Sequence, residues 1–195
     1  MKKNLILLIT LLCGFANSMS AFAFHDQINL QGQWQFALDP DSKITVSSAF
    51  SDVVSLPGTT DTNEKGIPCV KKDETTHLTR LFSYVGKAWY RRSLEIPIDW
   101  KKKTVRLCLE RTKPTTVFVD GKHVGTNNDI STEQIYDMSS YLVPGKHEIT
   151  IMVDNGAGVP KQLYANSHAY TEDTQTNWNG IIGQMYLDAK DPVHI

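Results

Sequence analysis

The stretch Thr115–Gly125, TTVFVDGKHVG, decides the fold class of this chain. Val117 and Val119 fall on one face of an extended segment, because side chains alternate between the two faces of a strand. Asp120-Gly121 follows at once, and this dipeptide between apolar runs is a strong signal for a hairpin. The stretch therefore predicts two antiparallel strands joined by a tight turn.

The same period of two recurs along most of the chain. Apolar side chains alternate with polar neighbours in further runs: Trp34, Phe36 and Leu38; Tyr90, Leu94 and Ile96; Val105, Leu107 and Leu109; Ile149, Ile151 and Val153; Met185 and Leu187. Many short strands separated by turn residues predict an all-β sandwich of jelly-roll type. Trp34, Trp89 and Tyr90 are expected in its core.

Helical periodicity is weak, and the best candidate is the segment Thr132–Leu142. This segment is short and contains a Ser-Ser pair, which does not favour a helix. We expect one turn or a loop there, with Ile135, Met138 and Leu142 pointing inward.

The first 23 residues have the pattern of a secretory signal peptide. Lys2 and Lys3 form a positive region, Leu5–Leu12 an apolar core, and Ala21-Phe22-Ala23 a cleavage signature. The apolar run is too short for a spanning helix. A lipoprotein would need Cys13 as its anchor, and the preceding Leu is larger than the small residue expected there. We therefore expect residues 1–23 to be removed, and residues 24–195 to form an exported domain, periplasmic or extracellular, that is not membrane-bound.

The net charge and the cysteines of the chain argue against several kinds of binding partner, namely nucleic acid, metal ions and cofactors. A formal net charge of -1 offers no basic surplus for phosphates, which argues against nucleic acid. Cys69 lies in a polar stretch and Cys108 is out of phase with its apolar neighbours, so we favour two separate thiols over a disulfide. Neither has a second Cys or a His at zinc-site spacing, so no metal and no cofactor is expected.

Six motifs occur in a recognisable order. They are LQGQWQFALDP (30–40), VSLPGTTDTNEKG (54–66), THLTRLFSYVGKAWYRRSLEIP (76–97), RLCLERTKPTTVFVDGKHVG (106–125), YDMSSYLVPGKHEITIMVDN (136–155) and DTQTNWNGIIGQMYL (173–187). Together they resemble the N-terminal sugar-binding domain of glycoside hydrolase family 2, which includes β-galactosidases, β-glucuronidases and β-mannosidases. The resemblance covers about Ile28 to Leu187. It implies a galactose-binding-like jelly roll, the class that the period of two indicates independently.

The resemblance places the chemistry outside this chain. Retaining glycosidases use two carboxylates about 5–5.5 Å apart, and the family carries them on a TIM barrel that follows an immunoglobulin-like domain. A barrel takes about 250 residues, and no such length remains after the sandwich. We expect no catalytic residue here, and we expect the immunoglobulin-like and barrel domains of the same enzyme to be partners. Asn63-Glu64 repeats the Asn-Glu pair of the family's acid/base, but its Gly- and Thr-rich loop indicates a surface acid.

The family also implies candidate sugar contacts in TEDTQTNWNGIIG, residues 171–183. A loop before the family's W-x-G-I motif reaches the active-site mouth and often carries an Asp six residues before the Gly. That position is Thr174 here, with Asp173 one residue further. Asp173, Gln175 and Asn177 still suit a sugar, because carboxylates and amides bond adjacent hydroxyls. The alternative is that they cap a turn.

Trp178 has two interpretations. As a platform it would stack on the apolar face of a sugar ring, and as an anchor it would fasten the loop to the sandwich. Its place before the closing strand favours the anchor. Gly180 fits a backbone with positive φ or a close backbone approach.

The second long polar connection, Pro57–Thr79, supplies further candidates. Asp61 and Asn63 are expected to face the same mouth, with turn formation as the equally supported alternative. Arg80 follows and would read an acidic sugar, pair with an acid of a neighbouring domain, or form an internal ion pair.

Three functions remain open from the sequence. The leading one is the sugar-binding domain of an exported family 2 exo-β-glycosidase, recognising a β-glycoside through its loops, with galactoside as the default sugar. The others are a stand-alone carbohydrate-binding module and a structural sandwich that packs domains together.

Overall fold

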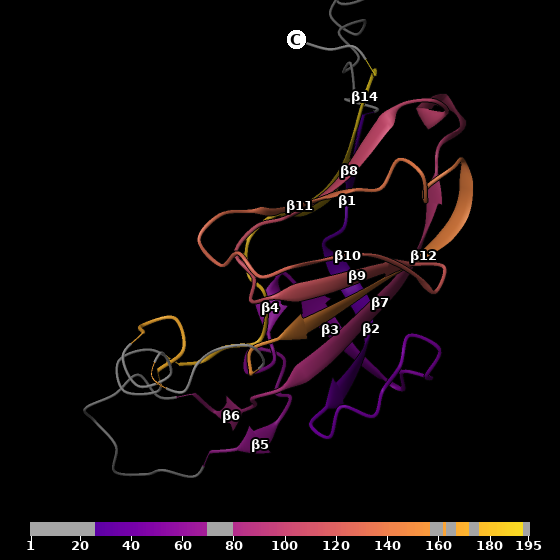
Figure 1. Ribbon diagram of the computed structural model, residues 1–195. Helices are drawn as coiled ribbons and strands as arrows, with labels where there is room; N and C mark the ends of the chain where they lie inside the picture. The colour runs from indigo at the N-terminus through magenta and orange to yellow at the C-terminus, as the bar shows by residue number, and fades with distance from the viewer. Residues whose placement is uncertain (1–25, 70–79, 157–161, 163–166, 172–175, 193–195) are drawn as a thin grey trace, which may run out of the picture.

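The computed structural model describes residues 26–69, 80–156, 162, 167–171 and 176–192. Their strands form two antiparallel sheets that pack face to face, and Figure 1 shows the smaller sheet lying above the larger one. Apolar faces buried between two sheets are one of the few stable layer arrangements. The predicted all-β sandwich is confirmed.

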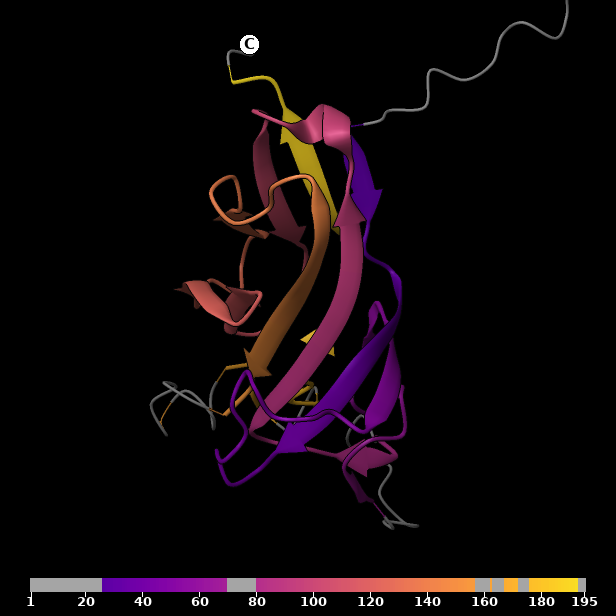
Figure 2. The ribbon, with the colours of Figure 1, turned by 90° about the vertical axis from the view of Figure 1, so that its right-hand side faces the viewer.

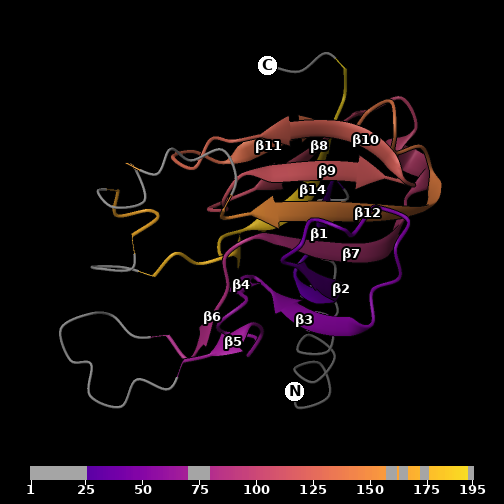
Figure 3. The same ribbon diagram turned by 60° about the horizontal axis from the view of Figure 1, so that its bottom comes forward.

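The larger sheet has six strands, visible one after another in Figure 3. Their order is β10 (Lys122–Asn127), β9 (Thr115–Val119), β12 (Gly145–Asp154), β7 (Lys87–Ile96), β2 (Gly32–Asp39) and β3 (Asp52–Leu56). The β9–β10 pair is the hairpin predicted at Asp120-Gly121, where both residues have positive φ. Strands β12, β7 and β2 run side by side along the length of the molecule (Figure 2).

The smaller sheet has four strands, in the order β1 (Gln27–Asn29), β14 (Met185–Lys190), β8 (Thr104–Leu109) and β11 (Gln134–Asp137). Two short ribbons complete the described fold: β4 (Gly58–Thr59) with β13 (Gly180–Ile181), and β5 (Ile67–Pro68) with β6 (Phe82–Ser83). The β5–β6 ribbon lies outside the sandwich (Figure 3). A short 3-10 helix, η1 (Ile98–Trp100), closes the end at which β14 finishes (Figure 2).

The core lies between the sheets and follows the predicted alternation. Val117, Ile151 and Leu107 are fully buried there, as are Trp34 and Tyr90. Trp89 is also buried, but it lies on the opposite face of β7 from Tyr90, because neighbouring residues of a strand point to opposite faces. The prediction of burial is confirmed, whereas Trp89 does not belong to the core between the sheets.

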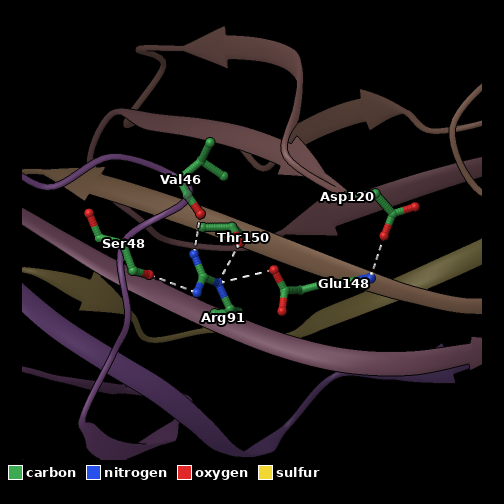
Figure 4. A network of polar contacts seen from close by, with 6 residues as sticks. All are labelled: Val46, Ser48, Arg91, Asp120, Glu148 and Thr150. Carbon is green, nitrogen blue, oxygen red and sulfur yellow. Dashed lines mark hydrogen bonds and ion pairs between the residues drawn. The ribbon is translucent and has the colours of Figure 1, made fainter.

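A second buried layer accounts for Trp89. The segment between β2 and β3 folds over the outer face of the larger sheet, where Phe50 and Phe118 contact the Trp89 ring. Arg91 holds this segment: its guanidinium donates to the carbonyls of Val46 and Ser48 (Figure 4). Strand β7 is therefore buried on both faces in its first half, from residue 88 to residue 91.

The prediction for residues 132–142 is wrong in one part. Gln134–Asp137 form strand β11 and pair with β8 instead of making a loop. The strand turns Tyr136 inward and leaves Ile135 45% exposed, so Ile135 does not point into the core. Met138 and Leu142 are buried as expected. The apolar spacing resembled one helical turn, but pairing with β8 imposed a period of two.

Cys69 and Cys108 are free thiols, as favoured from the sequence; Cys69 is exposed and Cys108 is buried. No helix among the described residues is long and apolar enough to cross a membrane. In the same residues, no group of three or more His, Cys, Asp or Glu side chains is arranged to hold a metal ion. The predicted signal peptide lies outside the described residues and stays a prediction.

Candidate functional site

A pocket of about 600 Å³ opens at the end of the sandwich opposite η1. Four described segments contribute to it: the connection from β8 to β9, the loop before β11, residues 167–171, and the chain around β13. Its lining consists of Glu110, Arg111, Lys113, Ile130, Ser131, Thr132, Glu133, Ala169, Trp178 and Ile182. Because the first of these segments crosses from one sheet to the other, both layers of the fold fix the walls.

Two buried asparagines hold the segment that carries Trp178. Asn177 is 1% exposed; its Nδ2 donates to the carbonyl of Asn155 (3.0 Å), and Asn155 Nδ2 donates to the carbonyl of Asn177 (2.9 Å). Arg80 Nη1 donates to the same Asn177 carbonyl (3.0 Å). These bonds tie the backbone before Trp178 to the end of β12.

Asn179 fixes the backbone on the other side. Its side chain is fully buried, its Nδ2 donates to the carbonyls of Gly86 (2.9 Å) and Val153 (3.1 Å), and its Oδ1 accepts from Tyr90 Oη (3.2 Å). Burial raises the pKa of Tyr90, so the phenol keeps the proton that it donates.

Gly180 allows the segment to approach β4. Its φ is 145°, and a Cβ there would lie 2.2 Å from the carbonyl oxygen of Gly58. Both conditions expected for Gly180 from the sequence are met, because only glycine combines this φ with so close an approach.

The Trp178 side chain is partly exposed and lines the pocket. Lys113 Nζ lies 4.8 Å from the centroid of its ring and 4.1 Å from that of Tyr170. The ring is therefore held against a buried cation while it also contributes to the pocket wall. This arrangement combines features of the anchor and the platform.

Polar groups complete the lining. Glu110 Oε2 accepts from the amide of Gln184 (2.9 Å), which fixes the Glu110 carboxylate.

The loop before β11 is ordered by Asp129, whose Oδ1 accepts from the amides of Ser131 (2.8 Å) and Thr132 (3.3 Å). These two amides and the Thr132 hydroxyl lower the pKa of Asp129, the Ser131 amide most of all. Carboxylates and hydroxyls beside an aromatic face suit a ligand that carries several hydroxyl groups and one apolar face.

The structure separates the predicted sugar contacts into three pairs: Trp178 and Asn177, Asp173 and Gln175, and Asp61 and Asn63. Trp178 lines the pocket, and Asn177 lies beside it but is buried. Asp173 and Gln175 lie outside the described residues. Their role, like that of Asn177 and Trp178 toward a sugar, stays a prediction.

Asp61 and Asn63 lie in the turn after β4, where their side chains bond to backbone. Asp61 Oδ1 accepts from the amides of Leu81 (3.0 Å) and Phe82 (2.8 Å). Asn63 Oδ1 accepts from the amide of Ser55 (2.8 Å), and its Nδ2 donates to the carbonyls of Ser55 and Thr59. The Asn63 bond to Thr59 is of the turn-forming kind left open from the sequence, whereas the Asp61 bonds reach amides outside the turn. Sugar contact by either residue stays a prediction.

Sequence reasoning did not single out Glu110, Lys113 or Glu133. Period-two patterns find strands, and these residues lie in connections whose shape depends on how the two sheets meet. One signal was available: ERTKP, residues 110–114, places three charged side chains between two strands with buried faces.

Comparisons with known proteins decide the family. The sequence model of "Glycosyl hydrolases family 2, sugar binding domain" matches residues 28–190. The chain belongs to this family. A β-galactosidase of Clostridium acetobutylicum is 22% identical to this chain over an alignment of 188 residues, and the match covers 86% of this chain and 20% of that protein.

Solved structures share the fold of the sugar-binding domain. A family 2 β-glucuronidase superposes with a TM-score of 0.65 at 21% identity, over 87% of this chain and 18% of that one. A β-glycosidase from Bacteroides vulgatus superposes with a TM-score of 0.61 at 24% identity, over 86% of this chain and 20% of that one. This chain thus spans about a fifth of the length of such relatives.

Proposed function

We propose that this chain is the sugar-binding domain of an exported family 2 exo-β-glycosidase, and that it contacts a β-glycoside in the pocket beside Trp178. The observation that carries the proposal is the partly exposed Trp178 ring in the pocket wall, with Glu110, Glu133 and Thr132 around it. An aromatic face takes the C–H face of a pyranose while polar neighbours bond its hydroxyls.

The reaction itself belongs to further domains in this proposal. Two relatives are named β-galactosidase and β-glucuronidase, so a galactoside and a glucuronide are the sugars to compare, with galactoside first. The chain by itself is expected to bind a glycoside weakly and to leave it intact, because the family's catalytic carboxylates lie on its barrel.

A titration followed by NMR tests the sugar site. Methyl β-galactoside and methyl β-glucuronide are added to the ¹⁵N-labelled chain at millimolar concentrations. We expect shifts of the Trp178 indole signal and of amides at 110–113 and 130–133, and loss of these shifts in Trp178→Ala. Phe118→Ala is the matched control, because Phe118 is a partly exposed aromatic residue on the outer face of the larger sheet. Absence of shifts with every glycoside would contradict the proposed site.

A second candidate is a stand-alone carbohydrate-binding module. The pocket supports it because its lining combines the Trp178 ring with the carboxylates Glu110 and Glu133. The two candidates differ in affinity: a module that acts alone should bind an oligosaccharide more tightly than the monosaccharide, whereas an exo-glycosidase domain should not. If no glycan binds, the remaining alternative is a sandwich that packs domains together.

Export is a separate part of the proposal, and it is supported by the pattern of residues 1–23. When the chain is expressed in a Gram-negative host, N-terminal sequencing of the exported product should begin at Phe24. A product that keeps Met1 and stays in the cytoplasm would contradict export.

A further inference from the structure

Lys113 is a lysine with almost no contact with solvent. It is 1% exposed, although it lies in a connection between strands, where lysines are usually solvated. Its neighbours fix the backbone on both sides: Thr112 Oγ1 donates to the carbonyl of Gly180 (2.9 Å), and the carbonyl of Pro114 accepts from the amide of Asp154 (2.9 Å). The side chain therefore starts from a fixed point beneath the pocket.

The Lys113 ammonium contacts two segments that lie apart in the sequence, one with Ala169 and Tyr170 and the other with Trp178. It donates a hydrogen bond to the carbonyl of Ala169 and lies 4.1 Å from the centroid of the Tyr170 ring. The same Nζ lies 4.8 Å from the centroid of the Trp178 ring. A cation over an aromatic face is attracted to it, and more strongly where water is excluded.

The choice of lysine needs a reason, because burying a cation is costly. An apolar side chain of similar length would fill the space without that cost. An ammonium differs in having three donors on one atom, which allows it to bond a carbonyl and face two rings at once. Through these contacts the ammonium links the Tyr170 segment to the Trp178 segment.

We infer that Lys113 is the positioning residue of the sugar site: its ammonium holds the Trp178 ring in place so that the ring forms the pocket wall. The side-chain bonds described for the flanking Asn177 and Asn179 run to the carbonyls of Asn155, Gly86 and Val153 and to the side chains of Asn155 and Tyr90. None of these bonds involves the Trp178 ring, whereas the Lys113 ammonium lies 4.8 Å from its centroid. The inference rests on the proposed function for the identity of the ligand. The part of the inference that concerns the position of the Trp178 ring does not depend on the proposed function.

Two substitutions separate charge from packing. Lys113→Met keeps the apolar stem and removes the cation, whereas Lys113→Arg keeps a cation that stacks well on aromatic faces. Lys103→Met is the matched control, because Lys103 is a largely buried lysine paired with Asp26 near the other end of the sandwich. The chain is labelled with 5-fluorotryptophan, and Trp178→Phe assigns its ¹⁹F resonance.

The expected result has three parts. Lys113→Met should shift or broaden the Trp178 resonance, leave those of the core residues Trp34 and Trp100 unchanged, and weaken the binding of methyl β-galactoside about tenfold or more. In Lys113→Arg, the Trp178 ¹⁹F resonance should stay close to its wild-type chemical shift, and the affinity for methyl β-galactoside should be within about threefold of the wild-type value. Lys103→Met should change neither. A Trp178 resonance and an affinity in Lys113→Met that equal those of the wild type would overturn the inference.

A measurement without substitution at Lys113 covers the case in which Lys113→Met does not fold. In the wild-type chain, the Hε protons of Lys113 should be shifted upfield by ring currents, and this shift should shrink in Trp178→Leu. An unshifted Hε signal overturns the inference. If the wild-type chain binds no sugar, the proposed function fails, whereas the ¹⁹F and ring-current results still decide whether Lys113 positions Trp178.

Discussion

The guanidinium carbon of Arg91 lies 3.9 Å from the centroid of the Phe50 ring, which places a buried cation between the outer face of β7 and the segment that covers it. Arg91 Nε also bonds Thr150 Oγ1 (3.2 Å) and lies 3.2 Å from Glu148 Oε1 (Figure 4). One side chain thus fastens residues 46–50 to the sheet.

Replacing Arg91 by Met should therefore destabilise the chain. The partly buried carbonyls of Val46 and Ser48 lose the guanidinium donor, which should lower the free energy of unfolding by about 1–3 kcal/mol. Urea denaturation measures it, and hydrogen exchange should quicken between residues 43 and 50. Glu148→Gln removes only a partly exposed ion pair and should cost less than about 1 kcal/mol. Equal costs for the two variants would contradict this account.

Asn179 is predicted to stabilise the folded chain as well as to hold the Trp178 segment in place. Asn179→Ala removes the Nδ2 donor to the carbonyls of Gly86 and Val153 and the Oδ1 acceptor of Tyr90, which should cost about 2–4 kcal/mol by urea denaturation. Asn128→Ala, at an exposed position, should change the free energy of unfolding by less than about 0.5 kcal/mol. A cost for Asn179→Ala as small as that of Asn128→Ala would show that the buried network does not hold the Trp178 segment.

Gly121 and Gly180 both have positive φ, and alanine substitutions at the two positions separate the cost of backbone strain from the cost of a steric clash. Gly121 has φ 77° and open space where a Cβ would be placed, so Gly121→Ala should cost only about 1–2 kcal/mol of left-handed strain. Gly180→Ala adds contact with the Gly58 backbone and should cost more than roughly 3 kcal/mol. Thermal unfolding of both variants measures the difference. A smaller cost at Gly180 would contradict the close approach of β13 to β4.

Acid should destabilise the fold through specific carboxylates. The Lys65 ammonium, 2.8 Å from Asp52 Oδ1, lowers the pKa of Asp52, and the hydroxyl and amide of Ser139 lower that of Asp137. A folded-state pKa below the ordinary value of 3.8 stabilises the fold above that pH. This stability is lost as pH falls through the lowered pKa.

Melting temperatures between pH 7 and pH 2 test this. The wild-type melting temperature should fall steeply below about pH 4. Asp137→Asn should melt lower at pH 7 and show a shallower fall, since one linked proton is removed. A parallel pair of curves would rule out Asp137 as a contributor.

The fold could be predicted because its strands carry their own signal. Val117, Val119 and Asp120-Gly121 specify a hairpin locally, and the buried faces of β8 and β14 alternate in the same way. Ile135 shows the limit: four residues of β11 take their period from pairing with β8, and nothing local in the sequence gives that pairing.

The site was less predictable than the fold. Trp178 stood out because a large aromatic residue in a polar loop is unusual, and it does line the pocket. Lys113 did not stand out, because its burial depends on how residues 110–114 pass between the sheets. Asp61 was a candidate by residue type, with a turn as the alternative; its carboxylate accepts from the backbone amides of Leu81 and Phe82, and its contact with a sugar stays a prediction. Residue type alone does not distinguish a turn from a binding site.

The central claim is that a β-glycoside lies against Trp178 in the pocket between the β8–β9 connection and the loop before β11. Intermolecular NOEs between the axial ring protons of methyl β-galactoside or methyl β-glucuronide and the protein test it most directly. The account predicts NOEs from the sugar to the Trp178 indole protons and to Ile182, which also lines the pocket. NOEs confined to other parts of the chain, such as the β5–β6 ribbon, would contradict it.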